Sequence, residues 1–404
     1  MPRLPDPRVL LCTVALLGAA PGCGFQPGPG PLSLTLNPAS LEALADAPEK
    51  KAELEALLVK YFGTRAGPRY ELTPGWKDAA IDPNHPEREL EGGLRAEFPP
   101  ERWQAIVAAN RQRLAWELAH APDEAERARI ENDYPSLAVS AELYRVECLH
   151  CHGVEGGGDG VTGATLVPRP RDFRKGIFKF TALKDKSRPR REDLNAILEH
   201  GIDGTGMPAF QRLSITEREG LVDYVRLLAI RGEVESLLVA GWQDEETLDE
   251  EAAIEALELV WERWQRAHEK VVAFDGPVPP DTPALRARGR ELFLDAKKGN
   301  CAACHGPEGR GDGPVAYKLD AQGRRVPAYQ DDWGFDVLPR DLRSGVFHGG
   351  SRPIDVYRRI YAGINGGPMP GLGETRDAEG RPLLAGDDLW AIVHYVRSLS
   401  ERSE

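Results

Sequence analysis

Two stretches of the 404-residue chain share an uncommon pattern of cysteine and histidine, Cys148-Leu-His-Cys151-His152 and Cys301-Ala-Ala-Cys304-His305. Each is followed, after a long intervening segment, by a methionine that stands directly before a proline, Met207 and Met369. The chain contains 3 methionines, and the remaining one is the first residue. Methionine commonly fills gaps in hydrophobic cores. Because this chain uses it so sparingly, the two internal methionines are candidates for a chemical role.

The spacing fits the covalent attachment of haem c. Two cysteines three positions apart can each form a thioether with one vinyl group of the haem, and the next histidine can bind the iron. A methionine sulfur can bind the opposite face of the ring, and this ligand pair raises the reduction potential of the iron. We therefore predict two covalently bound haems, with thioethers from Cys148, Cys151, Cys301 and Cys304 and iron ligands His152, Met207, His305 and Met369.

Two other functions are known for a pair of cysteines with this spacing. A thioredoxin-like redox pair uses both thiols but does not require a histidine after the second one. A structural zinc site needs a second pair of ligands, and the neighbouring sequence offers none. Because the pattern occurs twice with matching sequence downstream, it favours haem attachment over both alternatives.

An internal repeat extends well beyond the cysteines. Residues 148–160 read CLHCHGVEGGGDG, and residues 301–313 read CAACHGPEGRGDG. Later landmarks recur in the same order in both copies, PRDF and GIDGTGMP in the first, PRDL and GINGGPMP in the second. Because the segments between the landmarks differ in length, the pattern indicates a duplicated domain rather than a solenoid of short repeats.

Both repeats resemble class I c-type cytochrome domains, which are small helical folds wrapped around one haem. The resemblance covers residues 136–232 and 282–402, about half of the chain. It implies a mostly α protein with two tandem cytochrome c-like helical domains, to which the remaining sequence adds a helical N-terminal region.

The resemblance also implies a helix with an aromatic residue before each cysteine motif, which crosses a C-terminal helix of the domain. Tyr144 and Phe293 occupy the aromatic position. Gly289 suits a close crossing because glycine lets two backbones approach, whereas the first copy has Ser140 there. Ser214-Ile-Thr-Glu217 predicts a capping box at the start of the C-terminal helix of the first domain.

A further implication of the resemblance is a proline whose backbone carbonyl accepts a hydrogen bond from the ligand histidine and so fixes its ring. The candidates are Pro170 and Pro339, with Pro168 and Pro314 as rivals. Phe173 and Leu342 are expected to pack near the ring. The alternative is that these prolines only shape a loop.

The first residues predict export. Two arginines precede an apolar run over residues 9–20, which is too short to span a bilayer and suits a signal peptide over residues 1–22. Small residues before Cys23 resemble a bacterial lipoprotein cleavage site, so Cys23 is a candidate for lipidation; an ordinary signal peptide is the alternative. With Cys12 in the leader, Cys23 carrying the lipid and four cysteines in the haem motifs, none of the 6 is left for a disulfide. Haem attachment outside the cytoplasm, on the periplasmic side, agrees with this export.

Three segments carry no ligand motif. Residues 23–40 are rich in proline and glycine and predict a tether. Residues 41–135 predict a helical N-terminal region of unknown role, with helices from Leu41 to about Phe62 and from Phe98 to His120. Either a docking surface or a packing brace for the first haem domain would account for that region. Residues 233–281 predict a charged helical linker with a proline-rich end.

Charge restricts the partners. The formal net charge is −13, which argues against nucleic-acid binding. An acidic electron carrier would be steered toward a basic patch on a redox partner, although an acidic surface that only confers solubility is an equal alternative. Domains with a PRDF run and a Gly-Met-Pro loop resemble those that accompany membrane oxidase or quinol-oxidising complexes. That resemblance is an analogy between folds and does not by itself establish a shared function.

The sequence therefore predicts an exported, lipid-anchored di-haem cytochrome that passes single electrons between respiratory partners. One alternative is an enzyme, a bacterial di-haem peroxidase in which one iron is accessible to peroxide. Methionines in equivalent positions of both copies argue against it, and no catalytic residue is predicted. Another alternative is a haem-containing sensor or assembly subunit of a membrane oxidase complex, with the N-terminal region binding its partner.

Overall fold

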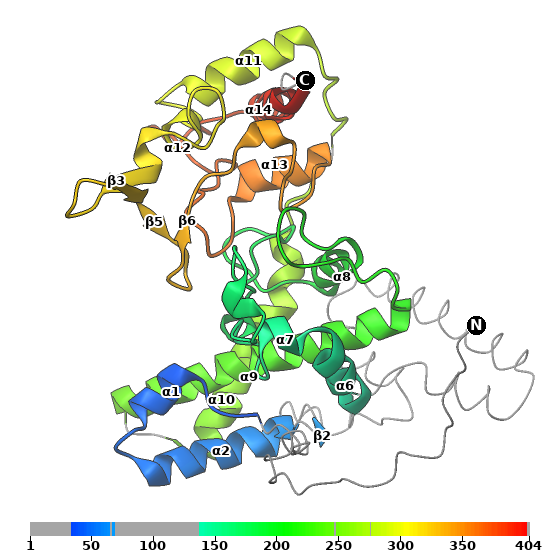
Figure 1. The fold of residues 1–404 in the computed structure, drawn as a ribbon, viewed down its shortest axis with the longest axis vertical. Helices are drawn as coiled ribbons and strands as arrows, with labels where there is room; N and C mark the ends of the chain where they lie inside the picture. The colour runs from blue at the N-terminus through cyan, green and yellow to red at the C-terminus, as the bar shows by residue number, and fades with distance from the viewer. Residues whose placement is uncertain (1–33, 65–66, 69–136, 246–247, 275, 402–404) are drawn as a thin grey trace, which may run out of the picture. The chain divides into compact units, whose positions relative to one another are not determined.

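The protein is described by a computed structural model in residues 34–64, 67–68, 137–245, 248–274 and 276–401 (Figure 1). These residues are mostly helical and contain three small two-stranded antiparallel sheets, so the predicted fold class is confirmed. The predicted signal peptide, Cys23 and the predicted helix over residues 98–120 lie outside the described residues.

The first haem domain is built around the crossing of its first and last helices. Tyr144 and Tyr224 meet at this crossing with ring centroids 5.2 Å apart, and the Tyr144 hydroxyl donates to the Gly153 carbonyl at 2.8 Å. The predicted capping box is confirmed, because Ser214 and Glu217 each accept a hydrogen bond from the other's backbone N–H. The elements in chain order are α6 (Leu137–Glu147), α7 (Leu149–His152), η3 (Gly163–Thr165), η4 (Phe173–Lys175), α8 (Arg191–His200) and α9 (Ile215–Glu245).

The second haem domain repeats this order of elements. Thr282 caps its first helix by accepting from the Leu285 N–H, and Pro283 follows at the first helical position. Phe293 and Tyr395 take the places of the two tyrosines, with ring centroids 5.3 Å apart. The elements are α11 (Pro283–Leu294), α12 (Ala302–His305), η6 (Pro314–Ala316), η7 (Leu342–Ser344), α13 (Pro353–Ala362) and α14 (Gly386–Glu401). The repeated sequence landmarks therefore lie in equivalent elements.

Two hairpins distinguish the second domain from the first. They fill the segment between η6 and η7, where the first domain has only a short loop. The first hairpin pairs β3 (Tyr317–Leu319) with β4 (Arg325–Pro327), and the second pairs β5 (Tyr329–Gln330) with β6 (Asp336–Val337). The mostly helical pattern of the sequence did not indicate them.

The described part of the N-terminal region packs on the first haem domain. The predicted helix from Leu41 to Phe62 is present as two helices, α1 (Pro38–Ala43) and α2 (Pro48–Phe62), and is followed by β1 (Gly63–Thr64) and β2 (Gly67–Pro68). Leu54, Leu58 and Phe62 are buried in the same hydrophobic core as Tyr144 and Phe173. This packing is what the brace alternative expects, and it leaves the docking surface as the other alternative. Helix α1 begins at Pro38, so the end of the predicted tether over residues 23–40 is helical.

Helix α9 runs without interruption through the predicted boundary between residues 232 and 233. Its second half packs against α10 (Glu250–Gln265), which is followed by η5 (Arg266–Lys270). Glu233 lies on α9 and accepts a hydrogen bond from the indole N–H of Trp264 on α10 at 2.8 Å. It also forms an ion pair with Arg188, which compensates the charge of the buried carboxylate. The segment predicted as a linker is therefore partly a continuation of the first domain.

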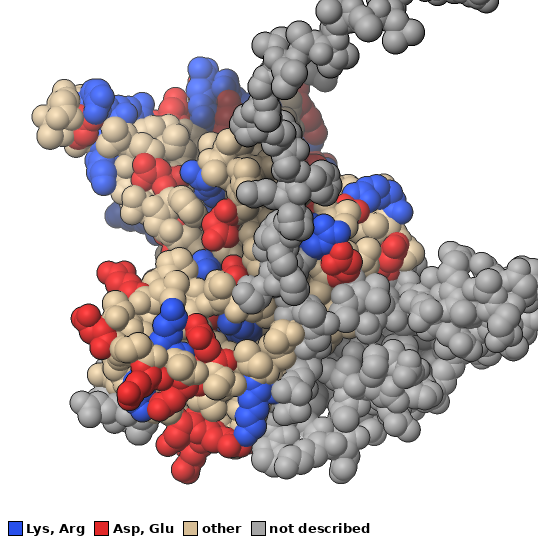
Figure 2. Space-filling model, turned by 60° about the horizontal axis from the view of Figure 1, so that its bottom comes forward, with Lys and Arg blue, Asp and Glu red and all other residues tan. Residues whose placement is uncertain are grey.

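The surface formed by these helices is acidic. Figure 2 shows acidic side chains where α1, α2 and α10 come forward, at the lower left of the view. Exposed carboxylates there include Glu49, Glu53, Glu55, Glu255 and Glu258. Among the described residues, no helix combines the length and the apolar character that a membrane span requires.

The close helix crossing in the second domain provides a stability test. A Cβ atom added at Gly289 would lie 1.9 Å from the backbone carbonyl oxygen of Ala391 on α14. We predict that Gly289→Ala lowers the free energy of unfolding by about 1–3 kcal/mol, because overpacking forces the helices apart. Chemical denaturation of the haem-loaded protein measures this change.

Gly241 in α9 is the matched control. A Cβ added there meets no atom within 4 Å. Gly241→Ala should leave stability unchanged or raise it by up to about 1 kcal/mol, since alanine favours helix over glycine. Equal effects of the two substitutions would contradict the proposed role of Gly289.

Candidate haem sites

Each cysteine motif lies on one short helical turn. In the first motif, the backbone N–H groups of Cys151 and His152 donate to the Cys148 carbonyl at 3.1 and 2.8 Å. In the second, Cys304 and His305 donate to the Cys301 carbonyl at 3.2 and 2.8 Å in the same way. Residues three and four positions apart on a turn share one face. The turn therefore presents two thiols and one imidazole to the same side in both copies.

All predicted thioether and iron-ligand residues line one continuous cavity of about 1660 Å³. This volume exceeds the roughly 300–1,000 Å³ of an ordinary small-molecule site, as expected for more than one large group. Much of the remaining lining is apolar, with Phe178, Leu198, Ile360 and Val396 among its members. The cavity thus has the size, the apolar wall and the sulfur and nitrogen donors that two haems would need.

Each of the two histidines is hydrogen-bonded to a backbone carbonyl through Nδ1. His152 Nδ1 lies 3.0 Å from the carbonyl oxygen of Arg171, and His305 Nδ1 lies 3.3 Å from that of Arg340. A carbonyl oxygen only accepts, so Nδ1 carries the proton in each ring. Nε2 then keeps its lone pair for a metal. This geometry suits an axial ligand of iron.

The prediction of Pro170 and Pro339 as acceptors was wrong by one residue. In each domain the proline carbonyl is instead directed at a glycine of the loop after the cysteine motif. A Cβ added at Gly158 would lie 2.5 Å from the Pro170 oxygen, and one at Gly311 would lie 2.4 Å from the Pro339 oxygen. The proline carbonyl thus lies against the cysteine loop, and the carbonyl of the next residue faces the histidine.

Burial keeps both histidines neutral. It lowers the pKa of His152 to about 4, even though the hydrogen bond to the Arg171 carbonyl acts in the opposite direction. Burial also lowers the pKa of His305, again against the carbonyl hydrogen bond. Metal ions bind the neutral imidazole, so ligation would not have to compete with a proton near neutral pH.

Burial has the opposite effect on the cysteines. It raises the pKa of Cys148 and that of Cys301 to about 12, and it raises the pKa of Cys151 and Cys304 as well. A thioredoxin-like pair needs a thiol with a lowered pKa, so the site does not fit that alternative. Among the described residues, no group of three or more His, Cys, Asp or Glu side chains is placed to hold a metal ion by itself.

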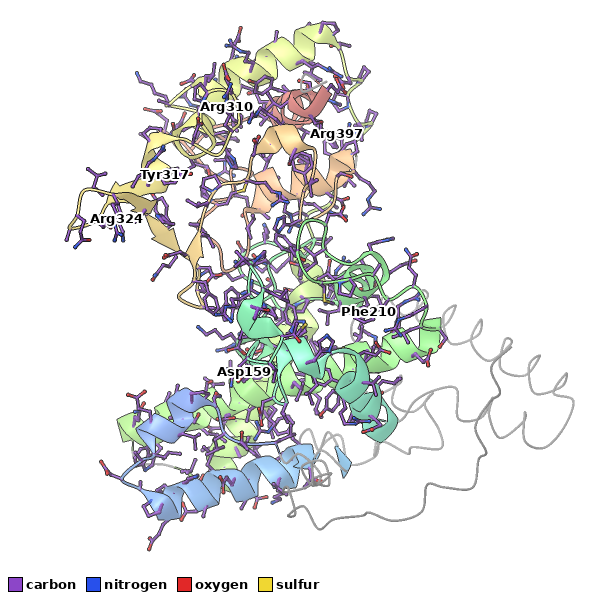
Figure 3. The ribbon with its side chains drawn as sticks, viewed as in Figure 1. Asp159, Phe210, Arg310, Tyr317, Arg324 and Arg397 are labelled. Atoms are coloured by element: carbon purple, nitrogen blue, oxygen red, sulfur yellow. The ribbon has the colours of Figure 1, made fainter. Side chains whose placement is uncertain are left out.

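The two methionine loops have the same hydrogen bonds. The Ile202 N–H donates to the Met207 carbonyl at 3.1 Å, and the Ile364 N–H donates to the Met369 carbonyl at the same distance. The first loop returns to α8 through Phe210, labelled in Figure 3, whose N–H donates to the Leu198 carbonyl at 2.7 Å. The loops therefore bring each methionine to the cavity by equivalent routes.

The two sites differ in the residue that packs beside the histidine. Phe173 stacks on the His152 ring with centroids 4.5 Å apart, as predicted for a residue near the ring. Its counterpart Leu342 is buried and lines the cavity. His348 also lines the cavity and meets the Phe180 ring edge-on, a contact between the domains that the sequence did not indicate.

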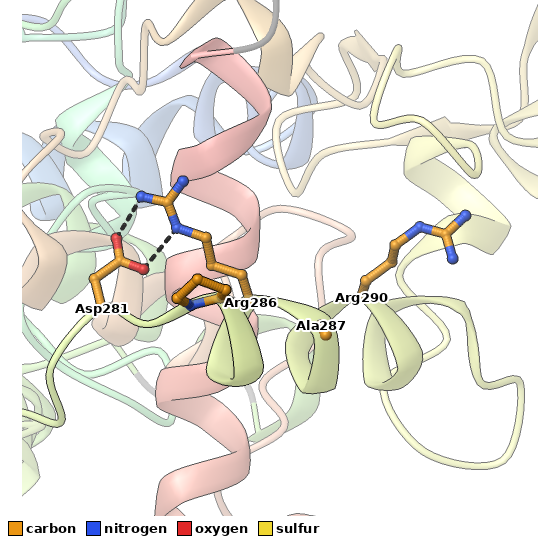
Figure 4. A pocket seen from close by; sticks show the side chains of 5 residues that line it. Asp281, Arg286, Ala287 and Arg290 are labelled. Carbon is orange, nitrogen blue, oxygen red and sulfur yellow. Dashed lines mark hydrogen bonds and ion pairs between the residues drawn. The ribbon is translucent and has the colours of Figure 1, made fainter.

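A smaller pocket of about 530 Å³ lies at the start of α11 (Figure 4). Arg286 forms a two-pronged ion pair with Asp281 on its wall, and His394 Nε2 lies 2.9 Å from the Pro279 carbonyl oxygen. These contacts attach the proline-rich end of the linker to α11 and α14. The pocket contains none of the predicted haem ligands.

Each haem domain matches a known protein family. Residues 135–225 match the family described as cytochrome c oxidase, cbb3-type, subunit III, and residues 286–400 match the family described as cytochrome c. No curated protein matches the chain. One solved structure, a chain of the reducing HAO-like protein complex of Kuenenia stuttgartiensis, is similar at 28% sequence identity and a TM-score of 0.47. The match covers 64% of this chain and 94% of that chain.

Cytochrome c domains imply covalently bound haem c, and two haems fit two domains. Both matched ranges contain one cysteine motif with its histidine and one Met-Pro pair. The chain therefore carries two cytochrome c domains in tandem and belongs to the di-haem c-type cytochromes.

Proposed function

We propose that the protein transfers single electrons between redox proteins through two haems c, each with histidine and methionine as iron ligands. The observation that carries this proposal is the equivalence of the two sites. In both domains a neutral histidine is fixed by a backbone carbonyl, and a methionine on a matched loop lines the same cavity. Haem iron supplies the change between the ferrous and ferric states. The chain supplies the ligands, their orientation and a wall that excludes water.

The same equivalence speaks against a peroxidase. An enzyme that reduces peroxide needs one iron with an open coordination position, and therefore two unlike sites. Here Met207 and Met369 are carried by loops with the same hydrogen bonds. A sensor would likewise need a site that opens to its ligand. Electron transfer requires only that both positions stay occupied.

A membrane oxidase is the proposed partner. The match of the first domain to subunit III of cbb3-type cytochrome oxidase supports this choice. The net charge of −13 and the exposed carboxylates of α2 and α10 favour docking to a basic patch on a partner. Attachment to the periplasmic side of a membrane through Cys23 would hold the carrier near such a complex.

The proposed function is tested by optical spectra and peroxide turnover of the purified haem-loaded protein. The expected result is two low-spin haems, both with the methionine-to-iron charge-transfer band in the ferric state, and no peroxide turnover above free haem. A high-spin haem together with rapid peroxide reduction would contradict the proposed electron carrier and support a peroxidase.

Replacing either methionine tests the ligands one at a time. Met207→Ala and Met369→Ala should each convert one haem to a form that binds added imidazole or carbon monoxide. Each should lower the potential of that haem by on the order of 0.1 V, because axial ligands set haem potentials over a range of about 0.8 V. Each variant serves as the control for the other, since its second haem stays native. An unchanged spectrum would remove the substituted methionine from the ligand set.

The membrane anchor is tested at Cys23. In a bacterial host that processes lipoproteins, Cys23→Ser should move the protein from the membrane fraction to the soluble periplasmic fraction. Cys12→Ser is the matched control, because this cysteine lies inside the predicted leader and should leave the distribution unchanged. If the Cys23 variant remained in the membrane fraction, the proposed anchor would be wrong.

A further inference from the structure

The arginine after the repeated proline has two roles in each domain. Its backbone carbonyl holds the histidine of its own domain, as described above for Arg171 and Arg340. Its side chain reaches the other domain, where Arg340 meets the methionine loop directly and Arg171 meets a tryptophan that packs on that loop. The two contacts are reciprocal, because Arg171 and Arg340 occupy the same position in the PRD landmark.

The first contact runs through Trp333. The guanidinium of Arg171 lies 3.5 Å from the centroid of the Trp333 ring, close enough for a stacked cation–π contact. The same tryptophan also packs on the loop that carries Met369. A Cβ added at Gly366 would lie 2.4 Å from the ring, and the Asp332 N–H donates to the Gly366 carbonyl at 2.9 Å. Trp333 thus lies between the support of one histidine and the loop of the other methionine.

The second contact is direct. A Cβ added at Gly204, in the loop that carries Met207, would lie 2.1 Å from a guanidinium nitrogen of Arg340. Arg340 is oriented by a hydrogen bond from Nε to the Val346 carbonyl at 2.7 Å. Gly204 and Gly366 hold the same position in the GID/GIN landmark. The contacts therefore join equivalent points of the two domains.

A buried ion pair fixes the segment that carries Trp333. Lys179 of the first domain pairs with Asp331 of the second at 2.7 Å, with side chains 12% and 4% exposed. Asn365 Nδ2 donates to Thr181 Oγ1 at 3.2 Å, and Arg359 donates to the Lys179 carbonyl at 3.1 Å. Buried polar pairs of this kind depend strongly on geometry, so they specify one arrangement of the domains. The turn between β5 and β6, absent from the first domain, supplies Asp331 and Trp333.

We propose that the crossed contacts of Arg171 with Trp333 and of Arg340 with Gly204 join the two haem sites into one electron-transfer unit, with Trp333 as a positioning residue at the contact between the two domains. The proposal rests on the proposed function of electron transfer. In the step concerned, one electron leaves the ferrous iron of one domain and reduces the ferric iron of the other. No bond is formed or broken and no proton moves.

The test uses the full haem-loaded chain with Trp333→Ala and Trp333→Phe. One haem is reduced rapidly by a flash-generated reductant, and the rate at which the electron redistributes to the other is followed optically. Trp333→Ala should slow this redistribution by about tenfold or more, because small displacements of reacting centres cost one to two orders of magnitude in rate. Trp333→Phe keeps an aromatic ring and should recover part of the rate.

Arg324→Gln is the control. Arg324 lies in the turn of the neighbouring hairpin (Figure 3), and its exposed side chain pairs with Asp320 at 2.7 Å. This pair lies within the second domain, so its loss should leave the redistribution rate unchanged. Arg340→Gln, which keeps the backbone carbonyl, should slow redistribution as Trp333→Ala does.

The spectra of each variant separate this proposal from the proposed function. Trp333→Ala could keep two low-spin haems and native potentials and still redistribute electrons at the native rate. That result would contradict the positioning role of Trp333 and leave the proposed carrier function intact. If instead the native protein itself shows a high-spin, peroxide-reducing haem, the carrier function fails regardless of Trp333.

Discussion

The hydrogen bond from each ligand histidine to a backbone carbonyl is the constraint on which the rest of the structure depends. The carbonyls belong to Arg171 and Arg340, and each sits where the preceding proline carbonyl is already directed at a glycine of the cysteine loop. The bond fixes the proton on Nδ1 and leaves Nε2 for iron, while burial keeps the ring neutral. The crossing of the first and last helices in each domain holds this loop in place.

The duplication gives two sites with the same candidate ligands but different surroundings. The first is braced by α1, α2 and α10 and has an aromatic ring stacked on its histidine. The second lacks the stacked ring and carries two added hairpins. Burial and neighbouring groups tune the potential of a haem whose axial ligands are fixed. The chain therefore has the means to separate two potentials without changing a ligand, which is what directional transfer through two sites requires.

Features that depend on local spacing could be predicted from the sequence. The cysteine and histidine spacing and the order of landmarks follow from residues near one another or from strict chemical requirements. The close crossing at Gly289 was expected from the resemblance to class I c-type cytochromes. The acceptor carbonyl was misplaced by one residue because neighbouring peptide groups in an irregular loop point in different directions. The continuity of α9 and the contact of Trp333 with Arg171 could not be predicted, since both depend on packing between segments far apart in sequence.

The central claim is that two equivalent, closed iron sites carry electrons and perform no chemistry on a substrate. A potentiometric titration of the whole protein, followed by optical spectra in the presence of carbon monoxide, tests it most directly. The account predicts two reversible one-electron steps, with both haems low-spin throughout and neither binding carbon monoxide. A haem that becomes high-spin on reduction, or that binds carbon monoxide in the native protein, would contradict it.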